Sequence, residues 1–289
     1  MKDSIDYLRK ICDTAKKAAL AAGELQRHNF HNYIKVQKVL EHDLKLETDK
    51  ESEQIILDIL QKDFPSFSLI TEESGMLHED TASCDENEEL YVWIVDPLDG
   101  SVNYYAGIPY FCVCIACYKM TKNQFEILQR NESLKDWGKP LVSVVYVPMQ
   151  NEMYYAIAGN GAFCNDLPIK CGNFKSLSEC LVLVTCGSLV VSTWHIAHLL
   201  PEISKKSLKV RMFGATGLDI VNVARGGAGV FFQEGPHLWD FAASRLILQE
   251  AGGFWEDSYM ENGRYKVMAT VGNNKVWQEM KEILNKKED

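Results

Sequence analysis

The sequence predicts a layered fold of the α/β or α+β class. The first part of the chain has the apolar spacing of long helices, the middle part is a series of short apolar runs, and the last part alternates such runs with helical patterns. Each such helix or strand has to bury its apolar face against another element, and packed layers achieve this. With 289 residues, the chain is long enough to bury a large core without disulfides or metals.

Two helices are expected before the first strand. Residues 4–25 place their apolar side chains on one stripe of a helix. A second helix is expected to begin after Thr48, because Thr48-Asp49-Lys50-Glu51 fits a capping box and apolar residues follow at helical spacing.

Strands are predicted where a short apolar run is bounded by turn residues. In the middle of the chain these runs cover residues 67–71, 90–96, 111–119, 141–147 and 153–158, with a hairpin turn at 148–151. Later strands are expected at 181–185, 209–213 and 229–233, and helices near 190–200, 217–226, 239–251 and 274–286.

Two polar stretches interrupt this pattern. Residues 122–140 have no clear period and are expected to form an excursion between two strands. This excursion could be a lid, a partner surface or a neutral insertion, and we favour the insertion. The acidic residues 78–89 are expected to form a mobile loop. No linker divides the chain, so residues 1–289 are predicted to form a single unit.

Composition and charge exclude several classes of partner. Acidic residues outnumber basic ones by 40 to 30, which gives a net charge of −10, so nucleic acid and anionic membranes are not expected to bind. Apolar residues never run for the ~18 positions of a membrane helix. The charged N-terminus lacks a secretory pattern, and nine cysteines are an odd number, typical of reduced thiols. We therefore expect a cytoplasmic protein.

The most informative motif is acidic and lies at the end of a predicted strand. The segment Asp96-Pro97-Leu98-Asp99-Gly100 places two carboxylates beside a turn. Two carboxylates this close repel each other unless a divalent cation lies between them, and oxygen ligands favour Mg²⁺ or Mn²⁺ over zinc. The alternative is an ordinary surface turn, for which Pro, Asp and Gly are common residues.

Other acidic residues are ambiguous on their own. Glu72 and Glu73 follow a predicted strand, but paired glutamates are common on solvated faces. Asp240 and Asp49 each lie where a helix is expected to begin, so capping is the simpler role for both.

Three cysteines occur within one predicted strand. Strand alternation places Cys112 and Cys114 on one face and Cys117 on the other, so the three cannot surround one zinc ion. We interpret them as core thiols.

Taken together, these motifs resemble the inositol monophosphatase family of Mg²⁺-dependent, lithium-sensitive sugar phosphatases. The resemblance covers nearly the whole chain. It rests on three acidic motifs in the family's order: Glu72-Glu73-Ser74, then the segment 93–104 around Asp96 and Asp99, and then Trp239-Asp240 followed by Glu250-Ala251-Gly252-Gly253.

The resemblance implies a five-layered α-β-α-β-α sandwich and hydrolysis of a small phosphomonoester. It implies an α+β half at residues 1–175 that carries most metal ligands, an α/β half at 176–289, and a possible homodimer. Two or three Mg²⁺ ions, or Mn²⁺, are expected. By family pattern, Glu72, Asp96 and the Leu98 carbonyl hold the first ion, and Asp96, Asp99 and Asp240 hold the second.

The resemblance also implies roles in catalysis and phosphate binding. Ser101 matches the family residue that helps to deprotonate the attacking water, and Asp49 matches the acid that supports it. Glu72 is also counted as catalytic, through a third and weaker metal site. The backbone amides of Gly100 and Ser101 are expected to hold phosphate oxygens.

Two departures from the family pattern concern the substrate. In the loop that contacts the sugar, Gly214-Ala215-Thr216 has its hydroxyl displaced by one position. Seven residues before Asp240, where inositol-type members have an acid, this chain has Gln233. An amide can bond a substrate hydroxyl but brings no charge.

Inositol monophosphate is the expected substrate, with two alternatives left open. The first is a 3′(2′),5′-bisphosphate nucleotidase or a fructose-1,6-bisphosphatase on the same fold. The second is a catalytically idle scaffold, although every expected metal-binding side chain is still an acid.

Overall fold

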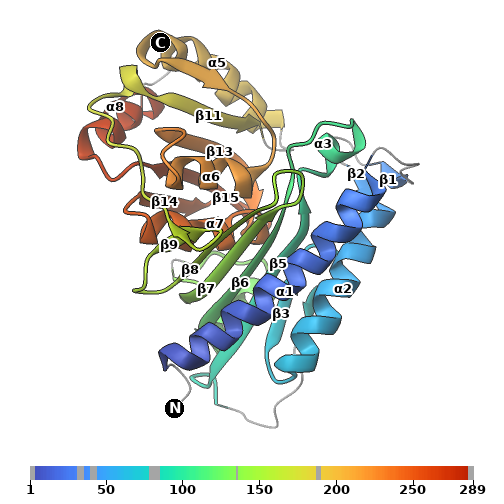
Figure 1. Ribbon diagram of the computed structural model, residues 1–289. Helices are drawn as coiled ribbons and strands as arrows, with labels where there is room; N and C mark the ends of the chain where they lie inside the picture. The colour runs from blue at the N-terminus through green and yellow to red at the C-terminus, as the bar shows by residue number, and fades with distance from the viewer. Residues whose placement is uncertain are drawn as a thin grey trace.

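Three helical layers alternate with two β-sheets in the computed structural model (Figure 1). The structure describes residues 4–30, 36–39, 44–77, 85–134, 136–186 and 190–285. Helices α1 and α2 cover one sheet, α6 and α7 contact strands of both sheets, and α5 and α8 cover the other. The expected α-β-α-β-α sandwich is confirmed.

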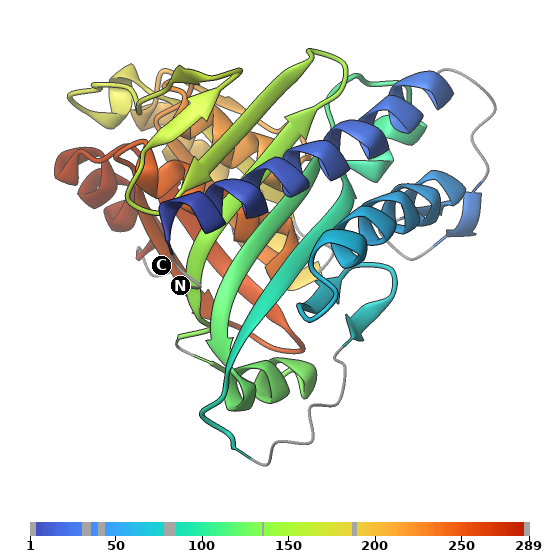
Figure 2. The same ribbon diagram turned by 60° about the horizontal axis from the view of Figure 1, so that its bottom comes forward.

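The outer helical layer consists of α1 (Ile5–Asn29) and α2 (Glu47–Asp63), which lie across one face of the large sheet (Figure 2). The Ser4 hydroxyl caps α1 by accepting from the Tyr7 amide at 3.3 Å. The expected start of α2 after Thr48 was wrong. The helix begins at Glu47, because the Asp49 carboxylate accepts from the Leu46 amide at 2.6 Å and closes the N-terminus there.

The large sheet has eight strands in the order β10-β9-β8-β7-β6-β5-β3-β4. Its neighbours are antiparallel except for β3 and β5, which run parallel. The strands are β3 (Ser68–Thr71), β4 (Gly75–Leu77), β5 (Glu89–Asp99), β6 (Cys112–Thr121), β7 (Lys139–Val147), β8 (Glu152–Ile157), β9 (Ala162–Cys164) and β10 (Leu167–Pro168). A separate hairpin pairs β1 (Val36–Val39) with β2 (Leu44–Leu46).

The second sheet has five strands in the order β12-β11-β13-β15-β14. They are β11 (Leu181–Cys186), β12 (Lys209–Arg211), β13 (Val230–His237), β14 (Phe254–Tyr259) and β15 (Arg264–Thr270). The helices around it are α5 (Val190–Lys206), α6 (Thr216–Ala224), α7 (Leu238–Glu250) and α8 (Asn274–Leu284), and short segments elsewhere form α3 (Ser101–Tyr105) and the 3₁₀ turn η1 (Leu177–Glu179).

The excursion expected at 122–140 was partly wrong. It contains a helix, α4 (Lys122–Gln129), whose N-terminus is closed by a capping box between Thr121 and Gln124. The hairpin turn at 148–151 is confirmed, and Asn151 supports it with a positive φ of 53°. The expected loop at 78–89 lies largely outside the described residues.

The two faces of the large sheet belong to separate cores. Trp93 and Val95 face α1 and α2, whereas Ile94, Cys112 and Cys114 belong to the core shared with α6, α7 and the second sheet. Phe241 lies in that shared core against the rings of Trp137, Trp255 and Tyr265. Within the described parts of the chain, no helix is both long and apolar enough to span a bilayer.

Candidate active site

A bulge in β5 places the two motif aspartates on one face of the sheet. Asp96 pairs with Cys114 and Asp99 pairs with Cys112, so three steps along β5 oppose two steps along β6. In a regular strand, residues three apart point to opposite faces. The extra residue of a bulge reverses this, so both carboxylates point toward α6 and α7.

Backbone amides stabilise these two buried carboxylates. Asp96 accepts from the Leu98 amide at 3.0 Å, and Asp99 accepts from the Thr216 and Gly217 amides at 3.0 and 2.7 Å. Burial is nevertheless the largest influence on both groups. It raises the pKa of Asp99 to about 6, and burial together with the nearby Glu72 carboxylate raises the pKa of Asp96 well above its usual value.

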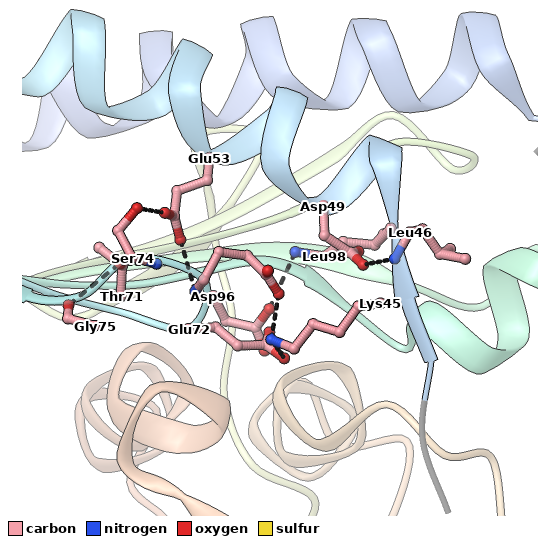
Figure 3. A network of polar contacts seen from close by, with 11 residues as sticks. Lys45, Leu46, Asp49, Glu53, Thr71, Glu72, Ser74, Gly75, Asp96 and Leu98 are labelled. Carbon is pink, nitrogen blue, oxygen red and sulfur yellow. Dashed lines mark hydrogen bonds and ion pairs between the residues drawn. The ribbon is translucent and has the colours of Figure 1, made fainter. Parts of the chain in front are cut away.

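Glu72 reaches the same place from a turn that α2 holds. The turn follows β3, whose parallel pairing with β5 places its last residue, Thr71, beside Val95, the residue before Asp96. Glu53 of α2 accepts hydrogen bonds from the Glu73 amide at 3.0 Å and from the Ser74 hydroxyl. Figure 3 shows Glu53 reaching down from α2 to this turn, with Glu72 and Asp96 next to each other beneath it.

A lysine from β2 partly neutralises these acids. Lys45 lies 3.4 Å from Glu72 and also forms an ion pair with Glu73 (Figure 3). The two glutamates raise the pKa of Lys45 against the opposing effect of its burial, so the lysine stays charged at neutral pH. The Lys45 ammonium group therefore places a positive charge next to Glu72, an expected ligand of the metal ions.

Asp49 lies near the acidic cluster and caps its helix at the same time. One carboxylate oxygen accepts from the Leu46 amide, while the other is buried and has no hydrogen-bond partner among the described residues. Burial, assisted by Glu72 and Glu73, raises the pKa of Asp49 to about 8. At neutral pH this carboxyl group therefore holds a proton in most metal-free molecules, and nearby cations would lower its pKa.

Asp240 comes from α7, the helix that follows β13 of the second sheet. It lies in the first turn of α7 and accepts from the His237 amide at 2.8 Å, so the expected capping role is present. It also lines a cavity of about 560 Å³ together with Glu72, Asp96 and Asp99. The structure therefore brings together the four expected carboxylate ligands and Leu98, all of which line this cavity.

The expected phosphate-binding residues line the same cavity. Gly100 has a φ of 92°, and a side chain there would lie 3.0 Å from the Tyr110 carbonyl, so the turn into α3 requires glycine. Ser101 follows as the first residue of α3 and also lines the cavity. In the described structure Ser101 does not hydrogen-bond to Asp49.

Three of the four expected substrate residues also line the cavity. Gly214, Thr216 and Gln233 line the cavity, and Ala215 is buried behind them as the N-cap of α6. The Thr216 hydroxyl donates to the Gln233 side-chain oxygen at 2.7 Å. The two residues that depart from the family pattern, Thr216 and Gln233, are therefore hydrogen-bonded to each other in the lining of the cavity.

The side chains that line the cavity suit a divalent cation that prefers oxygen ligands. Four carboxylates and two basic side chains, Lys45 and Arg264, line the cavity. Burial lowers the pKa of the nearby His237 to about 4, so this histidine adds no charge at neutral pH. The remaining negative charge repels a phosphate dianion until cations reverse the local sign.

Three residues near the site escaped the sequence prediction. Lys45 and Arg264 come from strands that carry no motif, and only the fold brings them to the cavity. Glu53 had a detectable pattern: it lies four residues after Asp49 and three before Ile56, on the buried stripe of α2. A buried glutamate on such a stripe needs a partner.

The five-layered fold and this acidic cavity define a phosphoric monoester hydrolase that depends on a divalent metal. A model of the "Inositol monophosphatase family" matches residues 7–127 and 133–288. The chain belongs to this family. It is 35% identical over 258 residues to "Inositol monophosphatase 3" of Solanum lycopersicum, which covers 86% of this chain and 85% of the relative. It is also 29% identical to "Nus factor SuhB" of Pasteurella multocida, with 96% of each chain covered.

Solved structures agree with this assignment. The extragenic suppressor protein suhB of Bartonella henselae superposes with a TM-score of 0.79 at 26% identity, covering 96% of this chain and 100% of that one. The inositol monophosphatase of Anabaena (Nostoc) sp. superposes with a TM-score of 0.71 at 27% identity, covering 94% and 95%.

We predict that Glu53 positions the turn that carries Glu72. Glu53→Ala removes the acceptor for Glu73 and Ser74, so Mg²⁺ affinity measured by calorimetric titration should fall about tenfold. Glu53→Gln keeps an acceptor and should restore part of the affinity. The exposed Glu51→Ala, in the same helix, is the control. Unchanged affinity in folded Glu53→Ala would contradict this role.

We predict that the metal-free protein loses stability as pH rises. The pKa of Asp49 is raised from 3.8 to about 8 and that of Asp99 to about 6, so the folded state holds these protons more tightly than the unfolded state. The free energy of unfolding in EDTA should therefore fall between about pH 4 and about pH 8.

Denaturant titrations across this range test the pH prediction. Saturating Mg²⁺ should reduce the loss, because the ion binds the ionised carboxylates of the folded state. Asp49→Asn should make the slope in EDTA shallower. A slope that is the same with EDTA and with Mg²⁺ would argue against repulsion within the cluster.

Proposed function

We propose that the protein hydrolyses a small polyol or sugar phosphate, with inositol monophosphate as the leading substrate, in a Mg²⁺-dependent reaction. The observation that carries the proposal is the convergence of Glu72, Asp96, Asp99 and Asp240 on one cavity that also contains the Gly100-Ser101 turn. A site that concentrates carboxylates beside the backbone amides of a turn suits a phosphate dianion bound through cations.

Two or three Mg²⁺ ions, or Mn²⁺, would be held by Glu72, Asp96, Asp99, Asp240 and the Leu98 carbonyl. When bound, such ions attract the phosphate, acidify water and stabilise the leaving alkoxide. The chain's own contribution is to position the carboxylates through the β5 bulge and the Glu53-held turn. The amides of Gly100 and Ser101 bind phosphate oxygens and orient the ester for attack.

Ser101 and Asp49 would move the proton of the attacking water. The Ser101 hydroxyl is too weak a base to act alone, so it takes that proton while passing its own to a carboxylate. Asp49 suits this role, since one of its oxygens is buried and lacks a hydrogen-bond partner among the described residues. Water is the nucleophile, so no covalent enzyme intermediate forms.

On the substrate side, Gln233 and Thr216 would contact hydroxyl groups. Their mutual hydrogen bond orients the Gln233 amide, which leaves its NH₂ group to donate to the substrate. A neutral donor of this kind suits a polyol without selecting for charge.

We predict that Asp96→Asn or Asp240→Asn lowers phosphate release from inositol 1-phosphate at least about 100-fold, the scale of losing one preorganised electrostatic group. Both variants should stay folded, because asparagine is nearly isosteric and the amides can still bond its oxygen. Phosphate release with and without Mg²⁺, alongside circular dichroism, provides the measurement. Retained Mg²⁺-dependent activity in both variants would end the proposal.

A second candidate substrate class is a bisphosphate, and Arg264 supports it. Arg264 pairs in register with His237, lines the cavity, and donates to the Gly235 carbonyl at 2.6 Å. No carboxylate lies within ion-pair distance of its guanidinium in the described part of the chain. A half-buried arginine with donors to spare is suited to a second phosphate group.

We predict that Arg264→Gln separates the two candidates. If the substrate is a bisphosphate, KM for fructose 1,6-bisphosphate or a nucleoside 3′,5′-bisphosphate should rise about tenfold, while KM for inositol 1-phosphate stays constant. Equal effects on all three substrates would assign Arg264 a structural role and favour the monophosphate.

A reducing compartment such as the cytoplasm is part of the proposal. All cysteines of the described residues are free, from Cys12 in α1 to Cys186 in β11. The homodimer implied by the family remains a prediction, which sedimentation analysis tests.

A further inference from the structure

Two thiols and one carboxylate meet beneath the active-site cavity. Cys112 and Cys114 are two residues apart on β6 and therefore face the same side of the sheet. The β5 bulge places Asp99 opposite Cys112 in the register. The three side chains belong to adjacent strands and are all buried.

Two of the three distances between their ligand atoms match the edges of a zinc tetrahedron. The Cys112 and Cys114 sulfurs lie 3.7 Å apart, and the Cys112 sulfur lies 3.4 Å from Asp99 Oδ2. All three ligand atoms are within 4.8 Å of one another. A tetrahedral zinc ion with ordinary bond lengths requires a sulfur–sulfur edge of about 3.8 Å and a sulfur–oxygen edge of about 3.5 Å.

We propose that Cys112, Cys114 and Asp99 form a binding site for a thiophilic divalent cation, with zinc as the natural candidate. Binding replaces both thiol protons, so one Zn²⁺ enters as two H⁺ leave. Sulfur ligands favour a soft cation over Mg²⁺, which selects oxygen. This site is therefore distinct in ligand type from the oxygen-only sites of the proposed function.

Helix α6 covers one of the two thiols. Gly217 of this helix packs so closely that a side chain there would lie 2.5 Å from the Cys114 sulfur. Asp99 is the one ligand of the three that lines the cavity. The ion would enter past Asp99, and its fourth ligand would be a water molecule from the cavity.

Because Asp99 belongs to both sites, zinc should affect catalysis, an expectation that rests on the proposed function. Asp99 is also an expected ligand of the second Mg²⁺ ion. A zinc ion held by Asp99 and the two thiolates would compete with that Mg²⁺ ion and inhibit hydrolysis. High Mg²⁺ should relieve the inhibition. The thiolate coordination itself does not depend on the catalytic proposal.

Cadmium titration of the reduced, metal-stripped protein tests the coordination. The absorbance of the cadmium–thiolate bond should rise to saturation with one equivalent in the wild type. Cys112→Ala and Cys114→Ala should each weaken this step at least about tenfold. Cys117→Ala is the matched control, because Cys117 is buried on the same strand but faces α1 and α2. Equal binding in all four proteins, or equal loss in Cys117→Ala, would overturn the proposal.

Zinc-edge X-ray absorption of the wild type gives a test that does not depend on variants. Two sulfur ligands support the site, and coordination by oxygen and nitrogen alone overturns it.

Adding Mg²⁺ during the cadmium titration tests whether the two sites share Asp99. If they do, Mg²⁺ should weaken cadmium binding. If Mg²⁺ leaves the thiolate step unchanged while hydrolysis remains Mg²⁺-dependent, the competition fails and the proposed function stands. If the thiolate step persists but Mg²⁺-dependent hydrolysis is absent, only the proposed function fails.

Discussion

The bulge in β5 is the constraint on which the site depends. Regular alternation would send Asp96 and Asp99 to opposite faces of the large sheet, one into the core beneath α1 and α2. With the bulge, both point to the layer that contains α6 and α7, where Asp240 lies in the first turn of α7. The same change of register places Asp99 beside Cys112. One inserted residue thus brings Asp99 both into the acidic cavity and beside the Cys112 thiol.

Gathering carboxylates in this way costs stability, and the surrounding backbone offsets part of the cost. Asp99 accepts hydrogen bonds from two backbone amides at the start of α6, and Asp96 accepts one from the Leu98 amide. The raised pKa values show that these bonds do not fully compensate for burial. Such a cluster is retained for function rather than for folding, because a buried charge without a counter-ion destabilises a protein. Helix α2 stabilises it further, since Glu53 fixes the turn that presents Glu72.

Sequence patterns predicted most elements to within a few residues, and the differences have physical causes. The Thr48 capping box failed because Asp49, one position later, reaches back to the Leu46 amide and closes the helix there. Helix α4 was missed because eight residues are too few to show a clear period. The cysteines were interpreted correctly as buried, but alternation along one strand could not show which side chains the neighbouring strand brings opposite them.

By itself, the sequence determined the local features of this protein: amphipathic helices, apolar strands, a glycine turn after Asp99, and acidic residues at the ends of strands and the starts of helices. These depend on neighbours within a few positions, which periodicity and turn chemistry reveal. Only the tertiary structure decided which acids share a cavity, that Lys45, Glu53 and Arg264 lie near them, and that Cys112 lies 3.4 Å from Asp99. These contacts depend on strand register and layer packing, which join residues far apart in the chain.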